Sequence, residues 1–178
     1  MIITIIRHGK VNHTWKKWCS SSEFDEECRL YDIAPIDNME NAGNIEAAKV
    51  YISTLDRSFQ SAKMLFGDIV FCKTDLINEV PLKSAFDTKL KLPLWFWNVA
   101  GRLQWLCNIS RQPETKHRTK ERAEQFVQEL INKGDDCVLV THGFFMHTLI
   151  AAMKKRGFNP DKTSLRYQNA EVIVLKRL

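Results

Sequence analysis

Two tripeptides of this sequence place a histidine and a glycine directly after a run of apolar residues. R-H-G at residues 7–9 follows the β-branched stretch at 2–6, and T-H-G at residues 141–143 follows the apolar stretch at 137–140. Imidazole can act as a nucleophile or as an acid and base near neutral pH, and the guanidinium group of arginine holds oxyanions. The two tripeptides are therefore candidates for catalytic chemistry on an anion.

A second arginine belongs to the same candidate site. Arg57 lies in the first turn of the helix that we expect after the apolar stretch at 50–53. Buried strands that alternate with helices predict a parallel sheet, and the carboxyl ends of its strands meet at one edge. Arg7 and Arg57 should therefore lie near the two histidines of the tripeptides. Four potentially positive groups repel one another unless they hold an anion, so the pattern indicates a phosphate site.

The glycines of the tripeptides support this interpretation. Gly143 begins an expected helix, whose first N–H groups and positive dipole end can bind a phosphate. Gly9 and Gly143 also allow the backbone to approach a ligand closely. Either histidine alone would more often be structural, but two such motifs with Arg57 between them favour a functional site.

The order of apolar and polar residues predicts the elements that position this site. We expect strands at 2–6, 50–53, 68–72, 137–140 and 171–178, and helices at 56–66, at 118–133, from 143 to about 157, and within 31–49 from the spacing of Ile45 and Ala48. Residues 11–27 are expected to form a polar loop, and residues 91–109 a helical or irregular segment. This alternation predicts the α/β class, as a three-layer α/β/α sandwich with a mostly parallel central sheet.

Composition limits the class of protein. The 178 residues are 44% hydrophobic and 26% charged, which predicts a single globular domain over residues 1–178. The five cysteines show no C-x-x-C spacing, and residues 1–6 are too short for a signal peptide, so we expect reduced thiols and a cytoplasmic location. The net charge of +5 favours anionic partners, but no nucleic-acid motif is recognisable, so we predict no nucleic-acid binding.

Three stretches of the sequence, IIRHGK, ISTLDRSFQSA and LVTHGFF, resemble the signature of the histidine phosphatase superfamily, also called phosphoglycerate mutase-like. That signature has R-H-G after the first strand, S-x-x-x-R-x-x-x-[ST]-A in the middle and a late H-G. The resemblance extends over most of the chain and implies an α/β sandwich with a phosphohistidine mechanism. It implies that His8 is the nucleophile and that the phosphate is clamped by Arg7, Arg57 and His142.

Elementary chemistry agrees with these implied roles. A nucleophilic histidine must be neutral, and neighbouring positive charge lowers its pKa toward that state. Arginine meets two phosphate oxygens at once and keeps its charge, so it can balance the charge of the transferring phosphoryl group. Because no metal-ligand cluster stands out in the sequence, we predict a reaction without metal or cofactor.

The departing oxygen needs a proton donor. The resemblance implies a carboxylic acid in the segment after the third strand, where Glu79 is the first choice and Asp87 the second, although a solvated surface carboxylate is the alternative. Asn12 could bind the phosphate through its amide or could be a turn residue. Ser53 is expected to support the clamp by a hydrogen bond.

Three tryptophans lie close together at Trp95, Trp97 and Trp105. The favoured interpretation is a helix that packs in the core or covers the pocket. The alternative is peripheral contact with a membrane, because tryptophan favours boundaries between water and apolar phases and basic residues lie nearby.

The leading functional hypothesis is a phosphatase that acts on a small phosphorylated compound. A phosphoglycerate-type phosphomutase is less favoured, because the chain is short for the mutases of this family. A non-catalytic anion-binding module is a third possibility. Substrate specificity is expected to come from residues 10–30 and 80–115, and the oligomeric state is not indicated.

Overall fold

The computed structural model describes residues 1–37, 39 and 49–177. Its helices are α1 Ser21–Ile33, α2 Asp56–Phe66, α3 Leu94–Leu106, α4 Lys116–Lys133 and α5 Gly143–Lys155. Its strands are β1 Ile2–Arg7, β2 Trp18–Cys19, β3 Val50–Ile52, β4 Cys72–Lys73, β5 Leu92–Pro93, β6 Cys137–Thr141, β7 Asn159–Pro160 and β8 Val172–Lys176.

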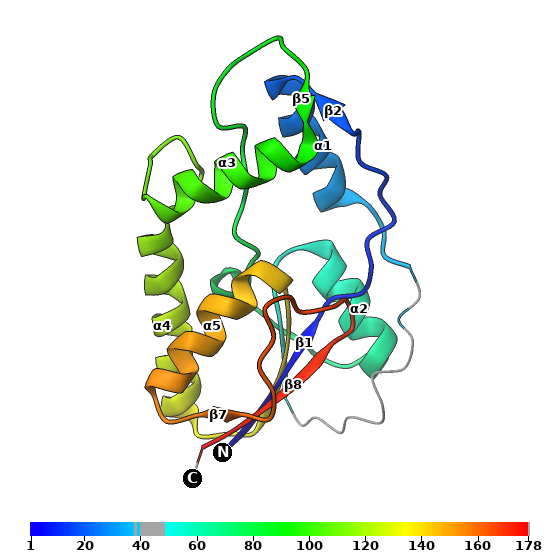
Figure 1. The fold of residues 1–178 in the computed structure, drawn as a ribbon. Coiled ribbons are helices and arrows are strands. Elements are labelled where there is room, and N and C mark those ends of the chain that lie inside the picture. The colour runs from blue at the N-terminus through cyan, green and yellow to red at the C-terminus, as the bar shows by residue number, and fades with distance from the viewer. Residues whose placement is uncertain (38, 40–48, 178) are drawn as a thin grey trace.

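Six of these strands form the central sheet, in the order β4-β3-β6-β1-β8-β7. Strands β4, β3, β6 and β1 are parallel neighbours, and β8 pairs antiparallel with both β1 and β7. The mostly parallel sheet predicted from the sequence is therefore confirmed. Strands β2 and β5 form a separate two-stranded sheet at the upper end of the molecule (Figure 1).

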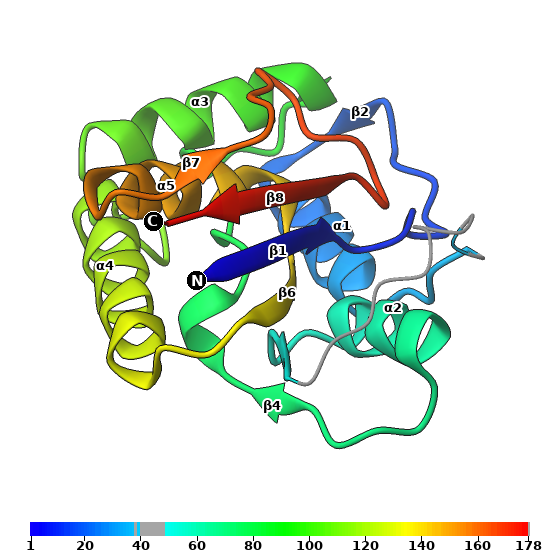
Figure 2. The ribbon, with the colours of Figure 1, turned by 90° about the horizontal axis from the view of Figure 1, so that it is seen from below.

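Helices cover both faces of the central sheet. Figure 2 shows α4 and α5 on one side and α2 on the other. Alternation along β1 explains this arrangement, because Ile3 and Ile5 pack toward the residues of α4 and α5, whereas Ile6 packs against Ala62 of α2. The predicted α/β/α sandwich is confirmed.

Two helices end where the sequence predicts. Gly67 follows α2 with a φ of 70°, and Gly134 follows α4 with a φ of 73°. Each glycine N–H bonds to the carbonyl four residues earlier, at Lys63 and Leu130. A backbone with positive φ favours glycine, so these two glycines in the sequence indicate where the helices end.

Two predictions about local structure are wrong. The strand predicted at 68–72 is reduced to Cys72–Lys73, and Val70 within it is 93% exposed. The predicted loop at 11–27 contains the beginning of α1, which starts with a capping box in which Ser20 and Glu23 bond to each other's backbone N–H. The helix predicted from Ile45 and Ala48 lies outside the described residues.

Helices α1 and α3, with β2 and β5, form a region above the central sheet that we call the cap (Figure 1). The cap has its own apolar cluster, in which Phe24 stacks on Trp97 at 5.8 Å between ring centroids. The Trp97 N–H donates to the carbonyl of Cys19 at 2.9 Å. The core interpretation of the tryptophan segment is therefore confirmed for Trp97.

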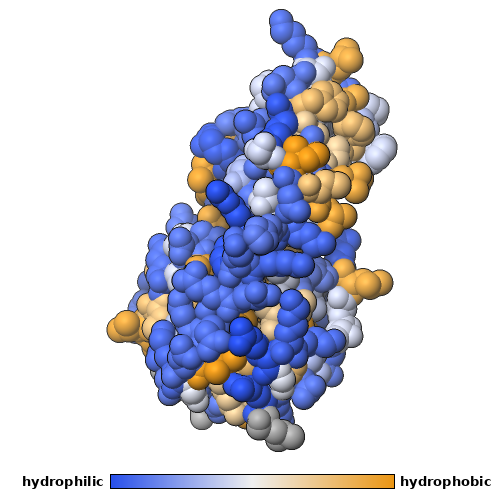
Figure 3. All heavy atoms as spheres, turned by 90° about the vertical axis from the view of Figure 1, so that its left-hand side faces the viewer, coloured by the Kyte–Doolittle hydropathy of each residue, from blue (hydrophilic) through white to orange (hydrophobic). Residues whose placement is uncertain are grey.

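Trp105 is also buried, and its N–H donates to Thr119 at 2.9 Å. Trp97 is fully buried and Trp105 is 9% exposed, so of the three tryptophans Trp95, which is 66% exposed, presents the most surface. A membrane contact of this segment remains a prediction. Figure 3 shows apolar side chains along one edge of the upper part of the molecule. Among the described residues, no helix combines the length and the apolar character needed to cross a bilayer.

Candidate active site

The carboxyl ends of three neighbouring strands meet at one edge of the sheet. Arg7 at the end of β1 pairs with Thr141 at the end of β6. One strand further, Ile52 of β3 pairs with Val140. The His8 N–H continues this pairing and donates to the carbonyl of Thr141 at 2.9 Å. The expected convergence is confirmed, and it brings the rings of the two histidines together, with 5.0 Å between their centroids.

His8 is held in one tautomer. Its Nδ1 lies 2.7 Å from the carbonyl oxygen of Gly9, and a carbonyl can only accept a hydrogen bond. Nδ1 therefore carries the proton, and Nε2 carries the lone pair. This is the arrangement that a nucleophilic imidazole needs.

His8 is also held neutral. Its side chain is buried, with 1% of the residue exposed. Burial, followed by the positive charge of Arg57, lowers the pKa of His8 to about 3. Neighbouring positive charge lowers the pKa of His8, as the sequence predicts, but the removal of water by burial lowers it more.

His142 is fully buried beside His8 and is fixed by two partners. Arg57 Nε donates to His142 Nδ1 at 3.1 Å, so Nε2 of His142 carries the proton and donates to the hydroxyl of Ser53 at 2.7 Å. Burial, followed by Arg57, holds the pKa of His142 well below its usual range. The support expected from Ser53 is present. Because both ring nitrogens of His142 are engaged, this histidine orients the guanidinium group of Arg57.

The serines around Arg57 explain the spacing of the central motif. Ser61, one helical turn after Arg57, donates to the Arg57 carbonyl at 2.6 Å and accepts the Gly9 N–H at 2.9 Å. Ser58 donates to the carbonyl of Val140. Helix α2 is thereby bonded both to the loop after β1 and to β6, which fixes the buried Arg57 at the site.

Two residues at the end of α1 complete the surroundings of Arg57, and sequence reasoning missed both. Asp32 accepts from Arg57 Nη1 at 2.8 Å, and the guanidinium carbon of Arg57 lies 5.2 Å from the ring centroid of Tyr31. The capping box of α1 could have revealed this helix, but no signal in the sequence places its end beside Arg57.

Arg7 leaves one buried donor for a ligand. Its Nη1 donates to the Tyr167 carbonyl at 2.5 Å, while its Nε is buried and has no hydrogen-bond partner among the described residues. A Cβ atom at position 143 would lie 2.7 Å from this Nε. Gly143 therefore makes room for the guanidinium group of Arg7, and a buried donor without a partner marks a place for an acceptor.

Glu79 lies at the N-terminus of α5. Its Oε1 accepts the N–H of Phe145 at 2.9 Å, and its Oε2 accepts the N–H of Phe144 at 3.2 Å. Glu79 therefore takes two of the N–H groups expected to bind phosphate at this helix N-terminus, and the role of Gly143 in phosphate binding remains a prediction. Glu79 also lines the main cleft together with Arg57.

The second choice for the proton donor does not line the cleft. Asp87 is exposed and pairs with Arg111 at 2.6 Å, which lowers the pKa of the Asp87 carboxyl. Asn12 is exposed, and its backbone N–H donates to the Pro35 carbonyl at 2.8 Å. The role of its side chain remains a prediction.

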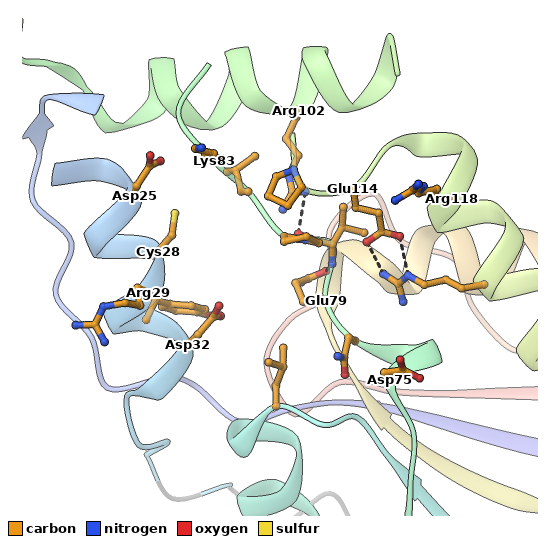
Figure 4. Close-up of a pocket in the computed structure, with 18 of the residues that line it drawn as sticks. Asp25, Cys28, Arg29, Asp32, Asp75, Glu79, Lys83, Arg102, Glu114 and Arg118 are labelled. Carbon is orange, nitrogen blue, oxygen red and sulfur yellow. Dashed lines mark hydrogen bonds and ion pairs between the residues drawn. The ribbon is translucent and has the colours of Figure 1, made fainter. Parts of the chain in front are cut away.

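A cleft of about 1030 Å³ opens above Arg57 and Glu79. Figure 4 shows α1 along one side of it and residues of α3 and α4 along the other, with Glu79 between them. The charged side chains that line it are Asp25, Arg29, Asp32, Arg57, Asp75, Glu79, Lys83, Arg102, Glu114, Arg118, Glu121 and Arg122. The cleft has room for a leaving group much larger than a phosphate.

Arg102 stabilises the wall of this cleft behind Glu79. Its guanidinium carbon lies 3.8 Å from the ring centroid of Phe144, and its Nη1 donates to the Val80 carbonyl at 3.1 Å. Because Phe144 and Val80 both bond to Glu79 through their N–H groups, Arg102 supports the backbone that holds this carboxylate. Sequence reasoning did not assign Arg102 to the site.

Within residues 1–37, 39 and 49–177, no three His, Cys, Asp or Glu side chains are grouped so that they could hold a metal ion. Metal-independent catalysis remains a prediction.

Comparison with known proteins agrees with these motifs and with this fold. Residues 3–177 match the histidine phosphatase superfamily (branch 1). A search of curated proteins finds no match.

Solved structures share the fold at low sequence identity. A mycobacterial glucosyl-3-phosphoglycerate phosphatase has a TM-score of 0.60 and 16% identity, over 98% of this chain and 89% of that one. The alpha-ribazole phosphatase of Shigella flexneri has a TM-score of 0.59 and 16% identity, over 98% and 89%. A phosphoserine phosphatase mutant of Entamoeba histolytica has a TM-score of 0.54 and 15% identity, over 97% and 89%.

Proposed function

The chain belongs to the histidine phosphatase superfamily, and we propose that it is a phosphomonoester hydrolase with His8 as its nucleophile. The observation that carries this proposal is the geometry of His8, which is buried and has its Nδ1 bonded to the Gly9 carbonyl, while burial and Arg57 lower its pKa and so favour the neutral form. Its Nε2 lone pair is then available at the edge of the sheet where Arg7 and Arg57 converge.

In the first step, Nε2 of His8 attacks phosphorus, and the bond from phosphorus to the ester oxygen breaks. The leaving oxygen takes a proton from Glu79. This residue accepts one N–H at Oε2, so a second lone pair on that oxygen is available to hold the transferred proton. The products of this step are a phosphohistidine, the alcohol and the Glu79 carboxylate.

In the second step, water attacks the phosphohistidine. The Glu79 carboxylate takes a proton from that water, the bond between nitrogen and phosphorus breaks, and inorganic phosphate leaves. His8 returns to its neutral state and Glu79 to its protonated state, so the cycle balances.

Positive groups would stabilise the transferring phosphoryl group. The unpartnered Nε of Arg7 is a buried donor for a phosphate oxygen. The guanidinium group of Arg57 is oriented by His142 through its Nε and by Asp32 through Nη1, which leaves Nη2 and the second N–H of Nη1 to meet the phosphate. In this proposal His142 acts mainly through Arg57. A contact of the Asn12 amide with the phosphate is part of the same proposal.

Two observations support a small phosphorylated compound as substrate. The similar solved structures are named as phosphatases of glucosyl-3-phosphoglycerate, phosphoserine and alpha-ribazole. The cleft above Glu79 accommodates a leaving group of that size. A cytoplasmic location is part of the same proposal, because all five cysteines are free thiols.

The proposal is tested with the variant His8→Ala on para-nitrophenyl phosphate. We expect kcat/KM to fall by at least about 1000-fold, because the attacking group is removed. His117→Ala, which changes an exposed histidine of α4, is the matched control and should keep wild-type activity. A folded His8→Ala protein with activity within tenfold of the wild type would overturn the proposal.

A further inference from the structure

Exposed apolar side chains are concentrated on α3 and its flanks. The described part of the chain exposes fifteen large apolar residues, of which nine lie in the cap or at its border: Trp18, Ile33, Phe86, Leu90, Trp95, Val99, Leu103, Leu106 and Ile109. Figure 3 shows apolar side chains gathered along one edge of this upper part. Single exposed apolar residues are ordinary, but a group of this size indicates a binding surface.

Helix α3 is apolar on two sides. Its inner side packs through Trp97 and Trp105. Trp95, Val99 and Leu103 follow one another at four-residue spacing, so they share the outer side, and each is more than half exposed. Val99 and Leu103 also line an apolar groove of about 450 Å³ that reaches Phe144.

The two-stranded sheet of the cap adds apolar surface next to the first turn of α3. Trp18 of β2 is 59% exposed and pairs with Pro93 of β5, directly before α3. The Leu94 N–H donates to the carbonyl of Lys17 at 2.9 Å, which fixes the two segments side by side. We call the surface formed by Trp18, Leu90, Trp95, Val99, Leu103 and Leu106 the α3 face.

Basic residues predominate in the segment that carries the α3 face. Residues 88–113 contain four basic residues and no acidic residue. Of these, Lys89 and Lys91 are exposed in the loop before α3, and Lys16 and Lys17 are exposed before β2. Lys91 pairs with Glu23 of α1 at 3.6 Å and Lys16 pairs with Glu27 at 3.7 Å, so Lys17 and Lys89 are the two of these lysines that have no acidic partner among the described residues. The surface therefore combines tryptophan, aliphatic side chains and lysine.

We propose that the α3 face binds the surface of a bilayer that contains anionic lipids. Tryptophan and aliphatic side chains enter the boundary between headgroups and acyl chains, and flanking lysines are attracted to anionic headgroups. Contact between two copies of this face is less favourable, because it would bring the lysines of both copies together.

Binding in this orientation places the catalytic cleft beside the lipid. Asn98 and Arg102 line both the apolar groove of α3 and the cleft. The proposal does not depend on catalysis, so it is tested independently of the phosphatase activity.

The test is sedimentation of the full chain with vesicles of phosphatidylcholine alone or mixed with phosphatidylglycerol. We expect at least tenfold tighter binding to the anionic vesicles, and weaker binding at high salt. Trp95→Ser combined with Leu103→Ser should reduce this binding at least tenfold. The matched control is Val70→Ser with Leu165→Ser, which changes two apolar residues that are even more exposed and lie elsewhere.

A second pair of variants tests the charge. Lys89→Gln with Lys91→Gln should weaken binding to anionic vesicles about tenfold, whereas Lys120→Gln with Lys154→Gln should leave it unchanged. All variants should keep wild-type hydrolysis of para-nitrophenyl phosphate, which shows that they fold.

The proposal is overturned if the wild type binds neither kind of vesicle, or if the α3 variants bind as their controls do. It is also overturned if light scattering finds a dimer that Trp95→Ser with Leu103→Ser dissociates while vesicle binding is absent.

Discussion

The edge of the central sheet and the cap above it are stabilised in different ways. At the sheet edge, His8, Arg57 and Ser61 are buried and joined by hydrogen bonds between strand ends and α2. The cap has a separate apolar cluster around Phe24 and Trp97 and exposes many apolar side chains. The sheet edge therefore holds the reactive groups, whereas the cap forms one wall of the cleft and much of the exposed apolar surface.

The largest effect is expected for a substitution in the core of the cap, and it is an effect on stability. Trp97→Ala should lower the free energy of unfolding by about 4 kcal/mol, because a fully buried indole leaves a cavity and the Cys19 carbonyl loses its donor. If the cap is stabilised separately, the amides of α1 and α3 should exchange with deuterium much faster, while those of β1 and β6 remain slow. Equal acceleration in the sheet would contradict this separation.

A change at the sheet edge should affect activity rather than the cap. Arg57→Lys should lower kcat/KM about 100-fold, because lysine cannot bond His142 and meet two phosphate oxygens at once. Steady-state kinetics with para-nitrophenyl phosphate measure this loss. Arg156→Lys, at an exposed position after α5, is the control. Activity within a factor of three of the wild type would contradict the role of Arg57.

The neutral state of His8 predicts a pH dependence of stability. The folded pKa of about 3 lies below the ordinary value of 6.5, so the unfolded chain takes up the proton first as the pH falls. Stability is therefore fully present above about pH 6.5 and is lost toward pH 3, and His8 accounts for about 2 kcal/mol of loss between pH 7 and pH 5.

Urea unfolding at both pH values checks this prediction. His8→Asn should lose less stability between pH 7 and pH 5 than the wild type does, by about 2 kcal/mol. His142 keeps part of the dependence in both proteins, because its pKa is lowered in the same direction. The same loss in variant and wild type would show that His8 is not held neutral by the fold.

The smallest effect is expected for a substitution at the contact between the cap and the sheet edge, and it is an effect on KM. Asp32 of α1 pairs with Arg57, and half of its side chain is exposed. Asp32→Asn should lower KM about threefold with little change in kcat, because a negative charge next to the incoming phosphate is removed. Asp75→Asn, another acidic residue of the cleft, is the control. An increase in KM would show that Asp32 assists binding.

The sheet and its edge could be predicted from the sequence better than the cap could. Strands β1, β3, β6 and β8 are rich in β-branched residues, and α2 and α4 end at glycines, so local patterns determine these elements. Because parallel strand ends share an edge, the positions of His8, Arg57 and His142 could be predicted as well. The partners of Glu79 could not, because they depend on how α5 begins beside a loop that is distant in sequence.

The cap was predicted less well for a physical reason. Helix α1 is polar, and among its apolar residues only Phe24 is buried, so periodicity does not reveal it. The contact of Asp32 with Arg57 depends on how this helix packs, which no local pattern encodes. The strand predicted at 68–72 is mostly absent because Ile69 and Val70 are exposed and do not pack in the core as strand residues would.

The central claim is that phosphorus is transferred to Nε2 of His8. Rapid mixing with a substrate labelled at phosphorus, followed by an alkaline quench and peptide mapping, tests it most directly. We expect a phosphoryl group on the peptide that contains His8, stable in alkali and lost in acid, and no labelled protein from His8→Ala. Label on another residue, or hydrolysis without any phosphorylated protein, would contradict the claim.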